Sequence, residues 1–558
     1  MLLGNRKLEV ALAIASVVLI LGNDKLVISG AESGVEGKTK SLAGLFSEIS
    51  RQQVLPPNTS SIYYHVHATA IHVDRSEFPL TKLLFRLTLK LALESVKKRL
   101  EGRGIKLSLR VRSANTCSHQ YAGAIAAEEY YTEKTRLFIV SGCDDAIRGV
   151  SRLASGWRVP VMTAAGFGAD LDNKSVYTTL IRVAFSMRTA VDFLVKVLKS
   201  FQWRRANLIV DESDANNLAL KGSIEKHIAD AQTDDFRLNL NLISFDLQTL
   251  ANVGTDASNS SSQGNTSHRS VIDEDNWPNK ITDNAVREAL RQSSLFSRVN
   301  ILLVSQHQLR KFMLTVHDMN MANGLYTFIN IPLLLVANEE QSDNQSGQTS
   351  TLQARQTYSA STGEDNFVWR SSLSPRNAQA KQAFESLMSI FLRSPTSKAY
   401  VYFSSKLSAL ANSNLSSGHL NSSYQDSNQL QTAKIQLNVN PYSASFYDCL
   451  QIYSLVLEES FSKLRKGNKG DLWRATTSND LHANISGQLR NRVFENMVTG
   501  TIILNEKGDR EADYTLNDLN QLTGKFAPVI LYRGDTKELE RQARIQWSSD
   551  LSGIDRMS

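Results

Sequence analysis

The chain has 558 residues, of which 42% are hydrophobic and 21% are charged, and its formal net charge at pH 7 is +7. A single hydrophobic core stops growing at about 300 residues, so this composition predicts a globular protein with two lobes or domains. The basic residues are spread along the chain without a Lys/Arg block, which argues against a nucleic-acid-binding protein.

An apolar segment near the N-terminus predicts entry into the secretory pathway. Two basic residues precede an apolar run from Val10 to Leu21. A run of about a dozen residues is short for a membrane span and suits the hydrophobic part of a signal peptide. Small residues at Ser29 and Ala31 fit a cleavage site, so we expect residues 1–31 to be removed. An uncleaved membrane anchor and a buried strand are the alternatives.

Strands and helices alternate in the first part of the chain. The pattern predicts strands at 62–73, 105–111, 135–141 and 159–163, and helices at 80–100, 121–131 and 145–155. The strand at 135–141 is almost continuously apolar, which is typical of a parallel sheet covered on both faces. We therefore expect βαβ units, and we expect residues 60–185 to form the first part of lobe 1.

The same alternation starts again after residue 185 and predicts a second doubly wound lobe at 186–438. Its predicted strands are at 206–210, 240–245, 299–304 and 326–336, and its predicted helices at 189–201, 220–231, 284–291 and 309–321. Ser/Asn-rich insertions near 256–275 and 341–365 interrupt it and are typical of surface loops.

The C-terminal part is predicted to return to the first lobe at 439–500 and to end in the second lobe at 501–548. A helical pattern covers 446–457. Two strands, 500–504 and 512–516, flank the turn at Lys507-Gly508-Asp509 and are predicted to pair as a hairpin. A last strand is predicted at 526–532.

Sequons and cysteines add to the case for secretion. Asn-x-Ser/Thr sequons, which are candidate glycosylation sites, lie at Asn58, Asn173, Asn259, Asn265, Asn344, Asn414, Asn421 and Asn484. Of the three cysteines, Cys117 and Cys143 fall at predicted strand ends of one lobe and are the favoured disulfide pair, with two free buried thiols as the alternative. Cys449 lies in a helical pattern and is expected to be a buried thiol.

Several segments resemble the extracellular ligand-binding domain of natriuretic peptide receptors, a family of receptor guanylate cyclases. The first-lobe segment Leu137–Ala165 contains FIVSGC followed by RLASGWRVPVMTAA. Ser443–Leu457 (SASFYDCLQIYSLVL) is similar to the family's Tyr-Asp helix, and Phe494–Leu516 is similar to its Gly-Asp-Arg segment. Asn496 departs from the family, which has Gly there. The resemblance covers about residues 60–548.

This resemblance implies an α/β fold of the periplasmic-binding-protein-like type I. Two doubly wound parallel-sheet lobes would be joined by crossing hinge strands, near 182–188 and again near 438–445. Ligands of such folds bind at the carboxyl ends of the strands. In natriuretic peptide receptors, by contrast, a secreted peptide lies between the two protomers of a homodimer. The resemblance also supports the Cys117–Cys143 disulfide.

A bound chloride is the one cofactor that the resemblance implies. In the family it lies at the Gly-Cys, here Gly142 and Cys143, and a nearby serine, here Ser113, contributes. Free backbone N–H groups at a helix start attract anions. An ordinary helix start is the alternative.

The candidate ligand-binding residues fall into two groups. His119 and Asp145 are placed near the peptide surface by the resemblance, although the family has an acidic residue and an aromatic residue there. The predicted strand ends offer Asn115, Thr163, Asp211 and Glu212 to a ligand in the crevice. Their alternative roles are capping and turn formation.

We find no motif for catalysis or for a metal site. Gly166-Phe167-Gly168 lacks the rest of a dinucleotide fingerprint and predicts a tight turn. His65 and His67 share one face of a predicted strand while His72 lies on the other, so the three are not expected to bind a metal. The sequence contains no P-loop and no Gly-x-Ser-x-Gly.

The sequence therefore predicts the ligand-binding region of a receptor, not an enzyme. A full-length relative would continue through a membrane helix to a guanylate cyclase domain, and neither is present in this chain, which ends at Ser558. We expect an extracellular or cell-surface ectodomain that binds a secreted peptide as a homodimer. The alternative is an amino-acid-like small molecule in the crevice between the lobes.

Overall fold

A computed structural model describes residues 64–74, 80–230, 236–256, 275–332, 369–371, 374–416, 439–466 and 480–546. The predicted signal peptide lies outside these residues, as do the insertion at 341–365 and most of the insertion at 256–275. Five of the sequons also lie outside them, namely Asn58, Asn259, Asn265, Asn344 and Asn421.

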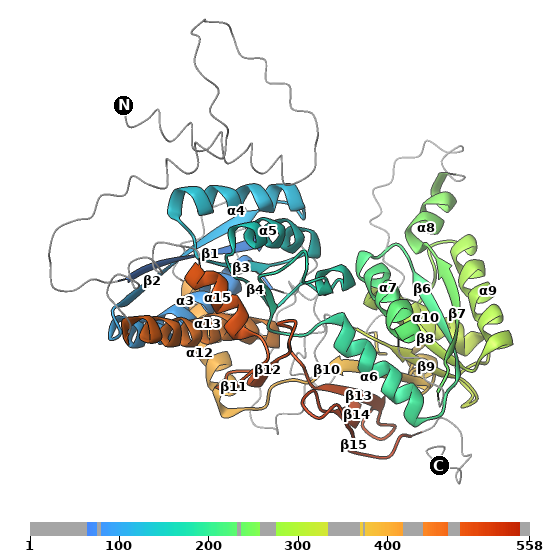
Figure 1. The fold of residues 1–558 in the computed structure, drawn as a ribbon. Coiled ribbons are helices and arrows are strands. Elements are labelled where there is room, and N and C mark those ends of the chain that lie inside the picture. Colours follow the sequence, from blue (N-terminus) through green and yellow to red (C-terminus); the bar gives the residue numbers. More distant parts are fainter. Residues whose placement is uncertain are drawn as a thin grey trace, which may run out of the picture.

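Lobe 1 is built on a parallel sheet of five strands in the order β2-β1-β3-β4-β5. The strands are β1 (Tyr64–Val73), β2 (Ile105–Ala114), β3 (Leu137–Ser141), β4 (Val161–Thr163) and β5 (Leu180–Arg182). Helices α4 (His119–Glu133) and α5 (Asp144–Trp157) lie on one side of the sheet, and α3 (Lys82–Glu101) lies on the other (Figure 1). All five residues of β3 are buried, as its apolar run predicts.

Lobe 2 is built on a mixed sheet of eight strands in the order β15-β14-β13-β10-β9-β8-β6-β7. The strands are β6 (Arg205–Asp211), β7 (Asn239–Phe245), β8 (Val299–Leu303), β9 (Thr327–Asn330), β10 (Leu387–Leu392), β13 (Tyr514–Leu519), β14 (Phe526–Tyr532) and β15 (Leu539–Arg541). The part from β7 to β10 is parallel, and β13, β14 and β15 are antiparallel. One apolar core runs through lobe 1 and onto one face of the lobe 2 sheet, and a second lies on the other face of that sheet.

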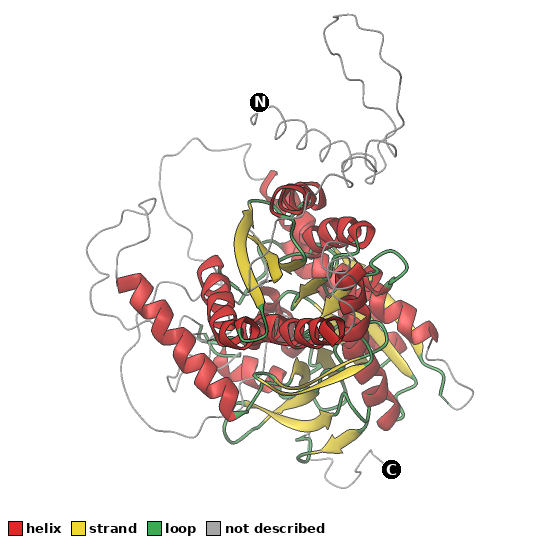
Figure 2. Ribbon diagram, turned by 60° about the vertical axis from the view of Figure 1, so that its left-hand side comes forward, coloured by secondary structure: helices red, strands yellow, loops and turns green. Residues whose placement is uncertain are grey.

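Helices cover the strands of both lobes (Figure 2). The lobe 2 helices are α6 (Met187–Ser200), α7 (Ala215–Asp230), α8 (Leu247–Asp256), α9 (Lys280–Phe296), α10 (Gln306–Asp318) and α11 (Asn377–Phe384). Side-chain caps explain where some of them start. Ser186 accepts a hydrogen bond from the Thr189 N–H at the start of α6, and Asn279 accepts one from the Thr282 N–H at the start of α9.

The chain returns to lobe 1 before residue 438, earlier than the sequence predicts. After β10 it enters α12 (Lys398–Ser416), which packs against α3 and α13 (Pro441–Lys466) of lobe 1. Helix α15 (Asp480–Leu489) then packs against α13. The helical pattern of α12 is a local property, so it does not indicate which lobe the helix covers.

The predicted hairpin of 500–504 with 512–516 forms only beside its turn, where Leu504 and Arg510 make an antiparallel bridge and the Glu511 N–H donates to the Ile503 carbonyl. Along its length, β12 (Gly500–Leu504) pairs with the preceding strand β11 (Arg492–Met497) in a separate two-stranded sheet, while β13 joins the lobe 2 sheet between β10 and β14. The turn at 507–509 exists, with Gly508 at a φ of 77°, but it sits beside β5 of lobe 1. The turn motif marks the local reversal of the chain, but the strands beyond it pair with other segments.

Candidate functional site

The disulfide Cys117–Cys143 joins the loop after β2 to the start of α5, with a Cα–Cα distance of 6.0 Å. The bond closes a loop with a sequence separation of 26 residues. On the chain-entropy account, a loop of this size stabilises the fold by about 3.5 kcal/mol. Cys449 is a free, buried thiol on α13, as the sequence predicts.

His72, Ser113 and Ser141 lie side by side at the carboxyl end of the lobe 1 sheet. His72 on β1 faces Ser113 on β2 and Ser141 on β3. Its Nδ1 is 2.8 Å from the Ser141 Oγ, and burial lowers the pKa of His72 to about 4. His72 is therefore neutral at physiological pH and serves as a hydrogen-bonding core residue.

The proposed anion position at Gly142 and Cys143 has features for and against an anion. Gly142 adopts a φ of 118°, and Cys143 precedes the first turn of α5 without a side-chain cap, which leaves backbone N–H groups at the helix start. The first turn also carries Asp144 and Asp145, whose charges oppose an anion. Arg148 lies within 4.0 Å of Asp144 and 2.5 Å of Asp145 and offsets part of that charge.

Asp144 is already bound by the loop that follows β4. Its carboxylate accepts hydrogen bonds from the N–H groups of Phe167 at 2.9 Å and Gly168 at 2.7 Å. Gly166 adopts a φ of 84° in this loop. The Gly-Phe-Gly segment is thus an irregular loop that binds a carboxylate of its own chain, and not the tight turn that the sequence predicts.

Three of the candidate strand-end residues are held by their own lobes. The Thr163 hydroxyl donates to the Val140 carbonyl at 2.7 Å and accepts from the Ala165 N–H. The buried Asp211 carboxylate accepts from the Leu247 N–H at 3.1 Å, and it also caps the turn that follows β6. Glu212 pairs with a lysine of α7 at 2.7 Å. These side chains therefore make their contacts within their own lobes.

The other three candidates lie close to the disulfide. Asn115 and His119 are exposed on either side of Cys117, and Asp145 is exposed two residues after Cys143. The disulfide thus gathers these three residues at one end of lobe 1, while Asp211 and Glu212 stand at the end of β6 in lobe 2.

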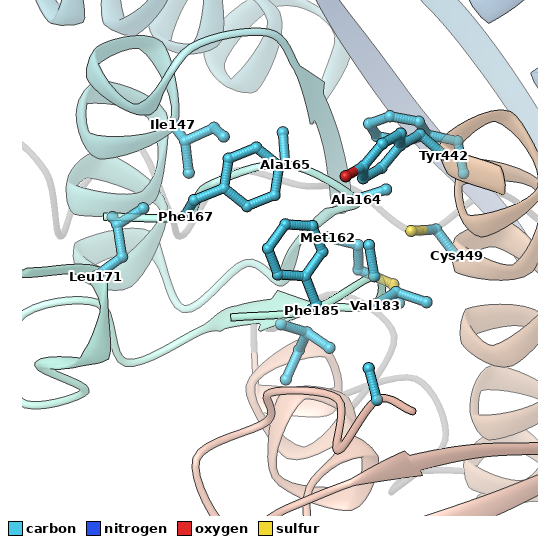
Figure 3. Close-up of a cluster of buried hydrophobic side chains, with 14 of the residues drawn as sticks. Ile147, Met162, Ala164, Ala165, Phe167, Leu171, Val183, Phe185, Tyr442 and Cys449 are labelled. Carbon is cyan, nitrogen blue, oxygen red and sulfur yellow. The ribbon is translucent and has the colours of Figure 1, made fainter. Parts of the chain in front are cut away.

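An aromatic cluster, Phe167, Phe185 and Tyr442, fills the lobe 1 side of the junction between the lobes (Figure 3). The ring centroids of Phe167 and Phe185 are 4.5 Å apart, and those of Phe185 and Tyr442 are 6.1 Å apart. Phe185 also packs against Tyr514 of β13 in lobe 2, and their ring centroids are 6.3 Å apart. No sequence motif marks this cluster, because its members come from three separate segments.

A buried ion-pair network joins β5 to the turn before β13. The Arg182 guanidinium donates from Nε and Nη2 to the two carboxylate oxygens of Asp509, each at 2.7 Å, and also pairs with Asp172. Lys174 donates to Asp509 at 2.9 Å. Burial alone would raise the pKa of Asp509, but the neighbouring cations bring it below its ordinary value. Burial lowers the pKa of Lys174 to about 8.

The next residue, Arg510, contacts the other segments of the hinge. It donates to the Val183 carbonyl at 3.3 Å and to the Thr499 hydroxyl at 2.9 Å. Thr499 in turn donates through its N–H and hydroxyl to Asp448 of α13, and burial raises the pKa of Asp448 to about 6. The Gly-Asp-Arg segment is therefore a structural tie between the crossing segments.

Among the described residues, no group of three or more His, Cys, Asp or Glu side chains could hold a metal ion. In the same part of the chain, no helix is long and apolar enough to cross a membrane.

Two doubly wound lobes with a tied hinge define a ligand-binding domain of the periplasmic-binding-protein-like type I. The chain belongs to the ANF receptor family, described as the receptor family ligand binding region, which matches residues 85–238 and 247–521. The matched region is a ligand-binding domain and not a catalytic one.

Several relatives match over most of the chain. The receptor-type guanylate cyclase gcy-28 of Caenorhabditis elegans is 23% identical over 77% of this chain and 30% of its own length. Human atrial natriuretic peptide receptor 2 is 25% identical over 78% of this chain and 35% of its own length. Human atrial natriuretic peptide receptor 3 is 22% identical over 71% of this chain and 57% of its own length. The chain thus spans between 30% and 57% of the length of these relatives.

Proposed function

We propose that this chain is an extracellular ligand-binding region that binds a secreted peptide hormone at the interface of a homodimer. The observation that carries the proposal is the family match together with the names of the relatives, two of which are atrial natriuretic peptide receptors. The disulfide and the exposed sequon residues Asn173 and Asn484 are consistent with a secreted domain.

The peptide surface would include the exposed residues around the disulfide, Asn115, His119 and Asp145. The disulfide fixes the loop that carries the first two against the helix that carries the third. A chloride at Gly142 and Cys143 would order the start of α5 by accepting hydrogen bonds from backbone N–H groups. Ser113 lies on β2 and is separated from the end of β3 by β1.

The alternative ligand is a small molecule in the crevice between the lobes. Two observations favour the peptide. The strand-end side chains Thr163 and Asp211 are already bonded within their own lobes. The aromatic cluster fills the junction where a small ligand would contact lobe 1.

Sedimentation of the secreted chain with and without extracellular peptide fractions tests the proposal. A peptide-dependent change in the sedimentation of the chain that weakens in the variants His119→Ala and Asp145→Ala, but not in Glu212→Gln, is the expected result. If amino-acid-like molecules bind instead, and Glu212→Gln or Thr163→Val abolishes their binding, the crevice is the site. A monomer that no peptide fraction changes would contradict the proposal.

A further inference from the structure

Strand β7 forms one edge of the lobe 2 sheet, and no described strand pairs with its outer side (Figure 1). Its sequence, Asn-Leu-Asn-Leu-Ile-Ser-Phe, contains neither a charged residue nor a proline. The central residue, Leu242, is 42% exposed. An exposed edge usually carries charges, a proline or a bulge, because its unpaired main-chain groups invite another strand.

The edge strands β2 and β15 do carry such protection. On β2, Arg110 and Arg112 form ion pairs with carboxylates of α4, and Lys106 is exposed. β15 has only three residues, and two of them are Glu540 and Arg541. β7 therefore lacks the protective charges that these two edge strands of the described sheets carry.

Two hydrogen bonds to β6 show which main-chain groups of β7 face outward. The Asn239 N–H donates to the Arg204 carbonyl, and the Phe245 carbonyl accepts from the Glu212 N–H. Alternate residues of a parallel strand bond to the same neighbour. The odd-numbered residues of β7 therefore bond to β6, and the N–H and C=O groups of residues 240, 242 and 244 point away from the sheet.

We propose that this edge pairs with the β7 edge of a second copy of the chain, antiparallel and with a two-fold axis at Leu242. In that register Leu242 faces the partner's Leu242, and Leu240 faces the partner's Ser244. Each outward N–H and C=O group then has a partner, because residues 240, 242 and 244 are symmetric about Leu242.

The absence of charge favours a second copy as the occupant. A charged edge strand would place like charges opposite each other in a two-fold pair, which is destabilising, and β7 has none to place. Helix α7 beside this edge adds apolar surface through Leu218, which is also exposed. Lys221 of the same helix reaches the Ser244 hydroxyl of β7 at 3.5 Å, which places the helix next to the edge.

Cross-linking tests the register. Paired residues in such a ladder have Cα atoms about 5.5 Å apart, so Leu242→Cys is expected to give a covalent dimer with a short thiol-reactive cross-linker. Leu240→Cys alone should not, whereas a mixture of Leu240→Cys and Ser244→Cys chains should. The native Cys117 and Cys143 are bonded to each other and the third cysteine is buried, so the background is low.

Sedimentation without peptide tests the strength of the pairing. Leu242→Pro removes an outward N–H and no bond to β6, so the fold should survive, as circular dichroism can verify. It should raise the dissociation constant of the dimer by about thirtyfold, because a symmetric dimer loses two hydrogen bonds. Leu242→Ala keeps all main-chain donors and should weaken the dimer less.

The proposal is overturned if the peptide-free chain stays monomeric and Leu242→Cys gives no cross-link. It is also overturned if Leu240→Cys alone cross-links as well as Leu242→Cys. A dimer that forms only with peptide and gives no cross-link at residue 242 would support the proposed function while overturning this pairing.

Discussion

The side chains of Arg182 and Asp509, 327 residues apart in the sequence, form a two-bond ion pair inside the protein. Arg182 is completely buried, and Asp509 is 3% exposed. One residue ends β5 in lobe 1, and the other precedes β13 in lobe 2. The pair therefore connects two segments that cross between the lobes. One follows β5 and leads from lobe 1 to lobe 2, and the other leads to β13 of lobe 2.

Replacing Asp509 by Asn should strongly destabilise the protein, because it leaves the buried Arg182 charge with Asp172 as its remaining carboxylate partner. Breaking a buried pair from one side costs about 3–5 kcal/mol. Urea denaturation measures the loss. Arg182→Met combined with Asp509→Leu removes both charges and should cost less than the single variant. A loss below about 1 kcal/mol in the single variant would show that the pair does not stabilise the fold.

The same pair predicts a dependence on pH. The pKa of Asp509 is below its ordinary value in the folded state, so its stabilising contribution is present above the unfolded pKa of about 4. The contribution is lost as the pH falls through the folded pKa. Wild type and Asp509→Asn should therefore differ most at neutral pH and become more similar in acid. A difference that does not change between pH 7 and pH 3 would contradict this prediction.

Gly508→Ala should destabilise the hinge turn by about 1–3 kcal/mol, because a side chain is strained at its φ of 77°. A Cβ there would also lie 2.5 Å from the Ile181 Cδ1. The matched control is Gly222→Ala in α7, where a Cβ meets nothing within 4 Å. That change should stabilise the protein by about 0.5–1 kcal/mol. Thermal unfolding measures both, and equal effects would argue against strain at Gly508.

Deprotonation of Asp518 on β13 should lower the free energy of unfolding as the pH rises. Burial raises its pKa to about 7, so the folded state binds a proton between about pH 4 and pH 7 that the unfolded chain releases. Asp518→Asn should therefore be more stable than wild type at pH 8 by about 4 kcal/mol and lose this advantage near pH 4. The gain in stability is limited by the hydrogen bonds that the Asp518 carboxylate accepts from the Leu519 and Gln546 N–H groups, because an amide has only one oxygen to accept them. Denaturation at both pH values is the measurement, and a constant difference would contradict the assignment.

Removing the disulfide with Cys117→Ser and Cys143→Ser should cost about 3.5 kcal/mol of stability. The loss should match the effect of a reducing agent on the wild type, since Cys449 forms no disulfide. Urea denaturation with and without reductant provides the comparison. If a reducing agent destabilises the double variant as much as the wild type, the Cys117–Cys143 bond is not the source of the stability lost on reduction.

Much of the fold could be predicted from the sequence, because most elements carry a local signal. The apolar run of β3 and the strand–helix alternation of both lobes were confirmed within a few residues. β10 was missed although Leu387–Leu392 is an apolar run, because a polar insertion precedes it and no predicted helix links it to β9. His119 and Asp145 were named from the family resemblance and Asn115 from a predicted strand end, and the role of all three in ligand binding stays a prediction.

The sequence by itself determined the class of fold, the two lobes and the family, because hydrophobic periodicity and short motifs are local properties. Only the tertiary structure decided that β12 pairs with β11, that α12 covers lobe 1, and that Arg182 meets Asp509. It also decided that Thr163 and Asp211 are occupied within their lobes. These outcomes depend on contacts between residues far apart in the chain, where several partners of similar local pattern compete and packing selects one.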